Sequence, residues 1–172
     1  IPCLTPDPSF EGAGVHLTGN GGYLQLHADF NRDLKHSLFR RVNTFIFLNQ
    51  PPWPDEYGGH LELWARNLTA CEQRILPTFG RFVVFSSTDF SYHGHPKPLQ
   101  LPPDRMRRSI AYYYYTREPH DNHECLASDC RNATRHSTLW QKPVGCSACQ
   151  QPACRRYPKV PRWAGTTRSE TE

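Results

Sequence analysis

A histidine and an aspartate two positions apart stand out in the stretch YLQLHADFN, residues 23–31, where apolar and polar residues alternate. Such alternation is typical of a β-strand, in which residues i and i+2 point to the same face. His27 and Asp29 would therefore present an imidazole and a carboxylate side by side. Together they supply two of the three ligands of a two-histidine, one-carboxylate site, which binds non-haem iron and leaves coordination positions open. The alternative is a structural polar pair at the mouth of a barrel.

A third ligand should come from a distant strand, and the segment FSSTDFSYHGHPKPL, residues 85–99, offers His93, with His95 as its rival. This segment follows the strongly apolar run RFVVF, so its end can return to the same edge of the fold. We expect His93 to be the ligand. The alternative for either histidine is an ordinary loop position.

A buried cation should also appear if a dicarboxylate binds beside the metal, and RRSIAYYYYT, residues 107–116, provides one. In a strand, Arg107 shares a face with Ser109, while Arg108 points the other way. A guanidinium group can grip a carboxylate through two parallel hydrogen bonds, and a serine hydroxyl can add another. The four tyrosines that follow would put two rings on each face, mainly as core packing.

Short strands separated by turn signals must carry these groups. We expect strands at residues 14–18, 23–30, 41–49, 60–64, 71–76, 81–87 and 107–116, a loop at 31–40 and an irregular segment at 88–106. No helical period of useful length appears. The pattern predicts an all-β sandwich or barrel.

Composition limits the remaining possibilities. The chain has 172 residues, 37% of them hydrophobic, and a formal net charge of +4 with no dense basic patch, so we expect no nucleic-acid partner. No apolar run is long enough to span a membrane. Since the chain begins with Ile1 rather than Met, we expect it to be processed or to be a fragment.

The last third of the chain has a different character, and we expect residues 117–172 to form a Cys-rich, partly disordered appendage to a core of residues 1–116. Five of the seven cysteines lie there: Cys125, Cys130, Cys146, Cys149 and Cys154. They suit disulfides, a structural zinc site or free thiols. Sequons at Asn67 and Asn132, together with these cysteines, favour the secretory pathway or endoplasmic reticulum over the cytoplasm.

Taken together, these motifs resemble the 2-oxoglutarate- and Fe(II)-dependent dioxygenases, in their prolyl 4-hydroxylase-like branch. The matching text is HADFN (27–31), RRVNTFIFLNQPPW (40–53), YGGHLELW (57–64), FSSTDFSYHGHP (85–96) and RRSIAYYYYT (107–116), with HSTLW (136–140) similar to a segment of some microbial members. The resemblance implies a double-stranded β-helix, or jelly-roll. It also implies that His27, Asp29 and His93 hold the iron and that Arg107 binds the distal carboxylate of 2-oxoglutarate.

Two departures from the family pattern concern the co-substrate. Family members often place a tyrosine hydroxyl on the distal carboxylate where this chain has Phe47, and Tyr23, Asn43 or Ser109 could supply a replacement. The interval between His93 and Arg107 is also longer than usual, so His95 and Arg108 stay open as alternatives.

The function implied by the resemblance is hydroxylation of an unactivated carbon with Fe(II), 2-oxoglutarate, oxygen and, as an accessory reductant, ascorbate. The branch suggests a protein or peptide substrate, most plausibly a prolyl side chain. The alternative is a cupin-like metal-binding jelly-roll that is inactive or catalyses a different reaction.

Overall fold

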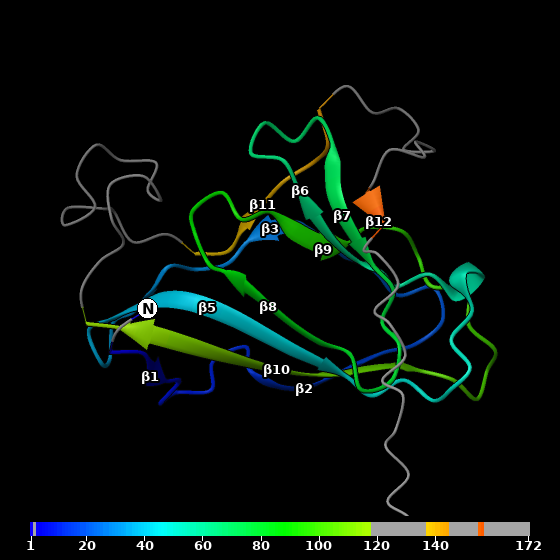
Figure 1. Cartoon of the computed structure of the whole chain (residues 1–172), viewed down its shortest axis with the longest axis horizontal. Coiled ribbons are helices and arrows are strands. Elements are labelled where there is room, and N and C mark those ends of the chain that lie inside the picture. The colour runs from blue at the N-terminus through cyan, green and yellow to red at the C-terminus, as the bar shows by residue number, and fades with distance from the viewer. Residues whose placement is uncertain (2, 118–136, 145–154, 157–172) are drawn as a thin grey trace, which may run out of the picture.

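Two β-sheets face each other in this computed structural model, which describes residue 1 and residues 3–117, 137–144 and 155–156 (Figure 1). The strands are β1 (Thr5–Pro6), β2 (Gly14–Thr18), β3 (Leu24–Ala28), β4 (Arg32–Asp33), β5 (Leu38–Phe47), β6 (Leu61–Trp64), β7 (Cys71–Ile75), β8 (Phe82–Ser86), β9 (His93–His95), β10 (Arg107–Thr116), β11 (Leu139–Trp140) and β12 (Arg155–Arg156). Helical structure within these residues is one 3-10 turn, η1 (Asp55–Tyr57). The arrangement is a double-stranded β-helix, so the predicted jelly-roll is confirmed.

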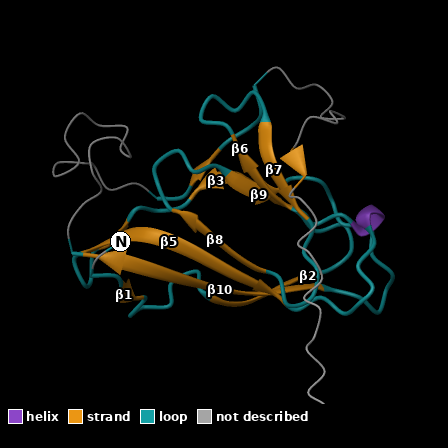
Figure 2. Cartoon of the chain, in the orientation of Figure 1, coloured by secondary structure: helices purple, strands orange, loops and turns teal. Residues whose placement is uncertain are grey.

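The first sheet is built on the two longest strands, β5 and β10, which pair antiparallel (Figure 2). Strand β8 pairs with the far edge of β5, β2 pairs with β10, and the short strands β4 and β1 extend the two ends. Along β10, buried and less buried side chains alternate from Arg107 onward. Arg107 and Ser109 are therefore on the interior face, as the sequence predicted, and Arg108 is exposed.

The second sheet has the strand order β11-β3-β9-β6-β7-β12 and lies above β5, β8 and β10 in Figure 1. Strand β9 is central to this sheet because it pairs with β3 on one side and β6 on the other. His27 on β3 lies directly opposite His93 on β9. Two segments more than sixty residues apart thus meet at one position of the sheet.

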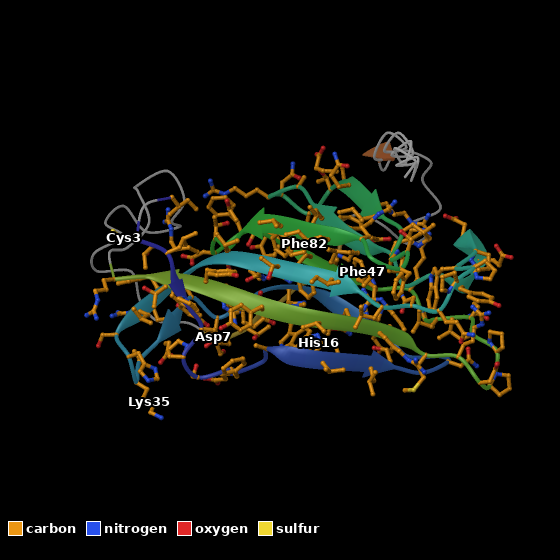
Figure 3. All side chains as sticks on the ribbon, turned by 60° about the horizontal axis from the view of Figure 1, so that its bottom comes forward. Cys3, Asp7, His16, Lys35, Phe47 and Phe82 are labelled. Carbon is orange, nitrogen blue, oxygen red and sulfur yellow. The ribbon has the colours of Figure 1, made fainter. Side chains whose placement is uncertain are left out.

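The core lies between the sheets. The first sheet buries the side chains on its inner face and exposes those on its outer face. Phe47 on β5 is fully buried and packs with Leu61 and Ile75 of the second sheet. Its neighbour Ile46 and the paired Phe82 on β8 are instead exposed on the outer face. Figure 3 shows Phe47 on β5 and His16 on β2, on either side of β10.

Two segments differ from the sequence predictions. Residues 31–40, predicted as a loop, contain β4 and the start of β5, because Arg32 and Asp33 pair with Phe39 and Leu38 in a hairpin. The irregular segment 88–106 contains β9. In both cases the strand forms by pairing with partners whose identity local sequence does not reveal.

Most of the predicted appendage lies outside the described residues. Cys125, Cys130, Cys146, Cys149, Cys154 and Asn132 lie outside the described residues. Cys71 is disulfide-bonded, Cys3 is a free and exposed thiol, and Asn67 is exposed. The described part contains no helix with the length and apolar character needed to cross a membrane. The division of the chain at residue 116 stays a prediction.

Candidate metal and co-substrate site

Three ligand-type side chains converge where β3 ends and β9 begins. One ligand atom each from His27, Asp29 and His93 lies within 4.8 Å of the others. His27 is the next-to-last residue of β3, Asp29 follows directly after that strand, and His93 opens β9. The sequence prediction brought the same three residues together, and their role as metal ligands stays a prediction that this geometry supports.

Asp29 is the meeting point of the two imidazoles. His27 Nε2 lies 3.4 Å from Asp29 Oδ1, and His93 Nε2 lies 3.6 Å from Asp29 Oδ2. The centroids of the two rings are 4.4 Å apart. All three donors therefore face a common point, on one side of the second sheet.

The tautomers of both histidines suit metal binding. His27 Nδ1 is 2.9 Å from the carbonyl oxygen of Gln25, and His93 Nδ1 is 2.9 Å from that of Ser91. Because a carbonyl oxygen can only accept, each Nδ1 carries the hydrogen and each Nε2 keeps its lone pair free. Metal-bound histidines are commonly oriented in this way. Two neutral imidazoles and one carboxylate fit an iron(II) ion.

The Asp29 carboxylate is itself held by two side chains of β5. Asn43 Nδ2 donates to Asp29 Oδ2 over 2.5 Å, and Arg40 Nη1 lies 3.1 Å from the same oxygen. Burial raises the pKa of Asp29, but His93, His27 and Arg40 outweigh it and hold the pKa well below its usual range. Asp29 is therefore a carboxylate at neutral pH.

Sequence reasoning missed Arg40, which lay in the predicted loop. Its side chain is 1% exposed, and its guanidinium lies 4.0 Å from the ring centroid of Phe30 and 3.7 Å from that of Tyr113. Arg40 Nε also donates to the Tyr115 hydroxyl. The signal that could have found it is the alternation that continues backward along β5, where Leu38, Arg40 and Val42 share a face.

Burial keeps the imidazole of His93 neutral. It lowers the pKa of His93 to about 4, although Asp29 opposes this shift. His95, the rival ligand, is also buried, and burial together with the positive charge of Arg107 lowers its pKa to about 3. Among the described residues, the group with metal-binding geometry contains His93 and not His95.

Arg107 reaches into the interior from β10 on the opposite sheet. It is 6% exposed, and its Nε donates to the carbonyl oxygen of Gly59 over 2.8 Å. Burial lowers the pKa of Arg107 to about 10, so the guanidinium stays charged at neutral pH. No carboxylate of a described residue forms an ion pair with it within 4.0 Å, and the buried hydroxyl of Ser109 on the same face has no hydrogen-bond partner. A carboxylate ligand would satisfy both groups.

Gly59 is a second residue whose role sequence reasoning missed, since the sequence predicted only that a strand begins after it, at residue 60. Its φ is +69°, and a Cβ there would lie 2.8 Å from Arg107 Cδ and 2.6 Å from Leu99 Cδ2. Glycine is required both for this backbone conformation and for the close passage of the Arg107 side chain.

The candidates for the missing tyrosine hydroxyl have different positions. Phe47 is buried and pairs with Ser109, and its ring lies 5.1 Å from the Arg107 guanidinium. Tyr23 is 54% exposed. Asn43 donates to Asp29. Of the residues predicted to bind the co-substrate, Arg107 and Ser109 thus share a buried face, while Tyr23 and Asn43 lie elsewhere.

Trp140 places a further aromatic ring beside His27. It belongs to β11, which pairs with β3, and it lies opposite His27. The centroids of the Trp140 and His27 rings are 5.0 Å apart, and Trp140 is 55% exposed. The Trp140 indole therefore lies against the His27 ring and is partly exposed to solvent.

The comparison with known protein families agrees with this arrangement. A family model described as the 2OG-Fe(II) oxygenase superfamily matches residues 13–115. Among solved structures, the chain is similar to a crystal structure of a Pseudomonas putida prolyl-4-hydroxylase, with 23% sequence identity and a TM-score of 0.44. That match covers 63% of this chain and 56% of the hydroxylase, so this chain spans little more than half of the hydroxylase's length. A comparison with curated proteins finds no match.

Proposed function

Because this chain belongs to the 2OG-Fe(II) oxygenase superfamily, whose model matches residues 13–115, we propose that it hydroxylates an unactivated carbon at the expense of 2-oxoglutarate. The balanced reaction converts R–H, O₂ and 2-oxoglutarate into R–OH, succinate and CO₂. Iron(II), when bound, supplies the activation of oxygen that this reaction needs.

The main observation behind the proposal is that a group of possible metal ligands on one sheet faces a buried arginine on the other. Two histidines and a carboxylate converge on the second sheet, and a buried arginine without a carboxylate partner in the described residues faces them from the first sheet. His27, Asp29 and His93 are proposed to hold the iron on three neighbouring positions and to leave the others open. Arg107 and Ser109 are proposed to bind the distal carboxylate of the co-substrate.

The surrounding residues have supporting roles in this proposal. The Gln25 and Ser91 carbonyl groups fix the two imidazoles, while Arg40 and Asn43 fix the carboxylate. These contacts keep the ligands in one geometry before the metal arrives. Phe47 and Phe85 give the interior apolar walls, which exclude water from the reaction.

The substrate is proposed to be a prolyl or other side chain of a peptide, on the strength of the sequence motifs that resemble the prolyl 4-hydroxylase-like branch. Ascorbate is proposed as an accessory reductant. A secretory compartment remains part of the proposal, supported by the disulfide of Cys71. A structural zinc ion in the appendage stays a prediction.

The test measures succinate formed from 2-oxoglutarate in the presence of Fe(II), ascorbate and a peptide library. We expect turnover in the wild-type chain and none in His27→Ala or Asp29→Ala. Circular dichroism should show that His27→Ala is folded, and it serves as the folding check for Asp29→Ala, which also leaves the buried Arg40 without its counter-charge. Arg107→Met should raise the 2-oxoglutarate concentration needed for turnover, whereas Arg108→Met is its matched control because that neighbour is exposed. Turnover retained in Asp29→Ala would refute the proposed site. Metal binding without any consumption of 2-oxoglutarate would favour the cupin-like alternative, for which Phe47 is the supporting residue.

A further inference from the structure

His95 is a buried polar residue to which the proposed reaction assigns no role. Building on the proposed function, we propose that His95 donates a hydrogen bond to the distal carboxylate of 2-oxoglutarate and replaces the tyrosine hydroxyl that Phe47 cannot provide. His95 would then be a co-substrate-binding residue in its own right and not a substitute for His93 at the metal.

The position of His95 on β9 supports this role. His93 and His95 are two residues apart on one strand, so their side chains leave the same face of the sheet. Gly94 between them lies against the backbone of β3, since a Cβ there would be 2.8 Å from the carbonyl oxygens of Leu24 and Gln25. His95 therefore continues, along β9, the interior row that His93 begins.

His95 lies between the two halves of the site. On β9, His93 pairs with Leu63 and Gly94 pairs with Glu62, so the strand runs from His93 toward the start of β6. Gly59, just before β6, accepts a hydrogen bond from Arg107. The proposed co-substrate must span this same interval, from the metal ligands to Arg107. A neutral imidazole in that interval can donate one hydrogen bond to a carboxylate without adding charge.

Two buried polar groups beside Arg107 have no hydrogen-bond partner among the described residues. His95 Nδ1 and Ser109 Oγ are both buried and without a partner, and the side chain of Arg107 uses its Nε on the Gly59 carbonyl. Buried polar atoms without partners are uncommon because each forfeits its hydration. A carboxylate that accepts from Arg107, Ser109 and His95 would satisfy all three groups at once.

The rivals that could replace the tyrosine hydroxyl are less suitable. Tyr23 is more than half exposed, and Asn43 uses its amide group on the iron-facing carboxylate of Asp29. Ser109 is short and lies on the same strand as Arg107, so it approaches the ligand from the same side. His95 approaches from the facing sheet, which Arg107 and Ser109 cannot do.

The experiment measures binding of 2-oxoglutarate to the full chain loaded with Mn(II), by calorimetry, so that no turnover is needed. We expect His95→Leu to weaken 2-oxoglutarate binding by roughly tenfold to a hundredfold, the usual effect of removing a hydrogen bond to a charged group. Mn(II) affinity should be unchanged. Binding of 2-oxopentanoate, which has a methyl group in place of the distal carboxylate, should be equally weak in both proteins.

Two further variants separate this role from a merely structural one. Phe47→Tyr should restore 2-oxoglutarate binding in the His95→Leu background, because it returns a hydroxyl beside Arg107. Tyr23→Phe should leave binding unchanged. Should His95→Leu fail to fold, nitrogen NMR of the wild-type chain loaded with Zn(II) gives the same answer: the His95 ring signals should shift with 2-oxoglutarate and not with 2-oxopentanoate.

The binding measurements distinguish a failure of the inference about His95 from a failure of the proposed function. Equal 2-oxoglutarate affinity in wild type and His95→Leu overturns this inference alone, as does a loss of Mn(II) affinity in that variant, which would make His95 a metal ligand. A wild-type chain that binds Mn(II) but not 2-oxoglutarate overturns the proposed function itself.

Discussion

Arg40 Nη1 lies 3.1 Å from Asp29 Oδ2, so the carboxylate proposed to face the iron is paired with a fully buried guanidinium on the opposite sheet. The Arg40 guanidinium also lies between the rings of Phe30 and Tyr113. The pair therefore connects the proposed metal site of the second sheet to the aromatic core of the first.

Replacement of Arg40 by methionine should destabilise the metal-free protein strongly. The variant keeps most of the side-chain volume but leaves Asp29 without its counter-charge, and breaking a buried ion pair in this way costs about 3–5 kcal/mol. Urea unfolding of the metal-free chain measures the free energy of unfolding. Arg66→Met is the control, because Arg66 stacks on Phe90 but is exposed. Equal losses in the two variants would contradict the importance of the Arg40–Asp29 pair.

Asn43→Ala should weaken metal binding. Asn43 donates to the carboxylate oxygen of Asp29, and loss of a group that orients a metal ligand typically costs ten- to a hundredfold in affinity. Asn49→Ala is a matched control, since Asn49 is equally buried but binds the Pro77 carbonyl and the Arg108 amide. Calorimetric titration with Mn(II) should show the loss in Asn43→Ala alone. A similar loss in both variants would mean that general destabilisation is the cause.

Gly59→Ala should impair both folding and co-substrate binding. The added methyl group meets the side chains of Arg107 and Leu99, and φ at this position is +69°. Gly80 has nearly the same φ, +72°, but nothing lies within 4 Å of its Cβ position. Gly80→Ala therefore reports the backbone strain alone, about 1–3 kcal/mol. We expect only Gly59→Ala to raise the KM for 2-oxoglutarate, and an unchanged KM would show that the side chain of Arg107 adjusts.

The sequence predicted the fold well where the residues of a single strand alternate between its two faces. The alternation around His27 and Asp29 predicted that the two side chains lie side by side, and the structure has His27 on β3 and Asp29 directly after it. The alternation in RRSIAYYYYT predicted that Arg107 and Arg108 point to opposite faces, and Arg107 is buried while Arg108 is exposed. The period of two in a strand is a local property, so a single segment reveals it.

The parts that sequence did not predict depend on contacts between distant segments. Strand β9 is only three residues long and forms because β3 and β6 pair with it on both sides. Gly59 has its role because Arg107, far along the chain, passes against it. Arg40 fell in a predicted loop because the β4–β5 hairpin has no strong turn signal, and its partner Asp29 lies on the other sheet.

Glu62→Gln should change how stability depends on pH. Burial raises the pKa of Glu62 above its usual value, although the Trp64 indole and Arg74 oppose this shift. The folded state thus binds the proton more tightly than the unfolded state, and the free energy of unfolding falls as pH rises above about 4.5. The variant lacks this loss, so its stability relative to wild type should increase between pH 4 and pH 7 in urea unfolding. Glu72→Gln, an exposed carboxylate on β7, controls for net charge. A constant difference between Glu62→Gln and wild type would contradict the prediction.

Trp140 should report metal binding by its fluorescence. Its ring lies 5.0 Å from that of His27, so a Co(II) or Fe(II) ion bound to His27 would be close enough to quench the indole. Titration of the wild-type chain with Co(II) should lower the tryptophan emission, and Trp140→Phe should remove most of that change without altering the metal affinity found by calorimetry. Trp53→Phe is the control, because Trp53 packs with Leu99 and Leu101 in a separate cluster. Quenching that survives in Trp140→Phe would mean that β11 does not lie beside β3 in solution, or that the metal binds away from His27.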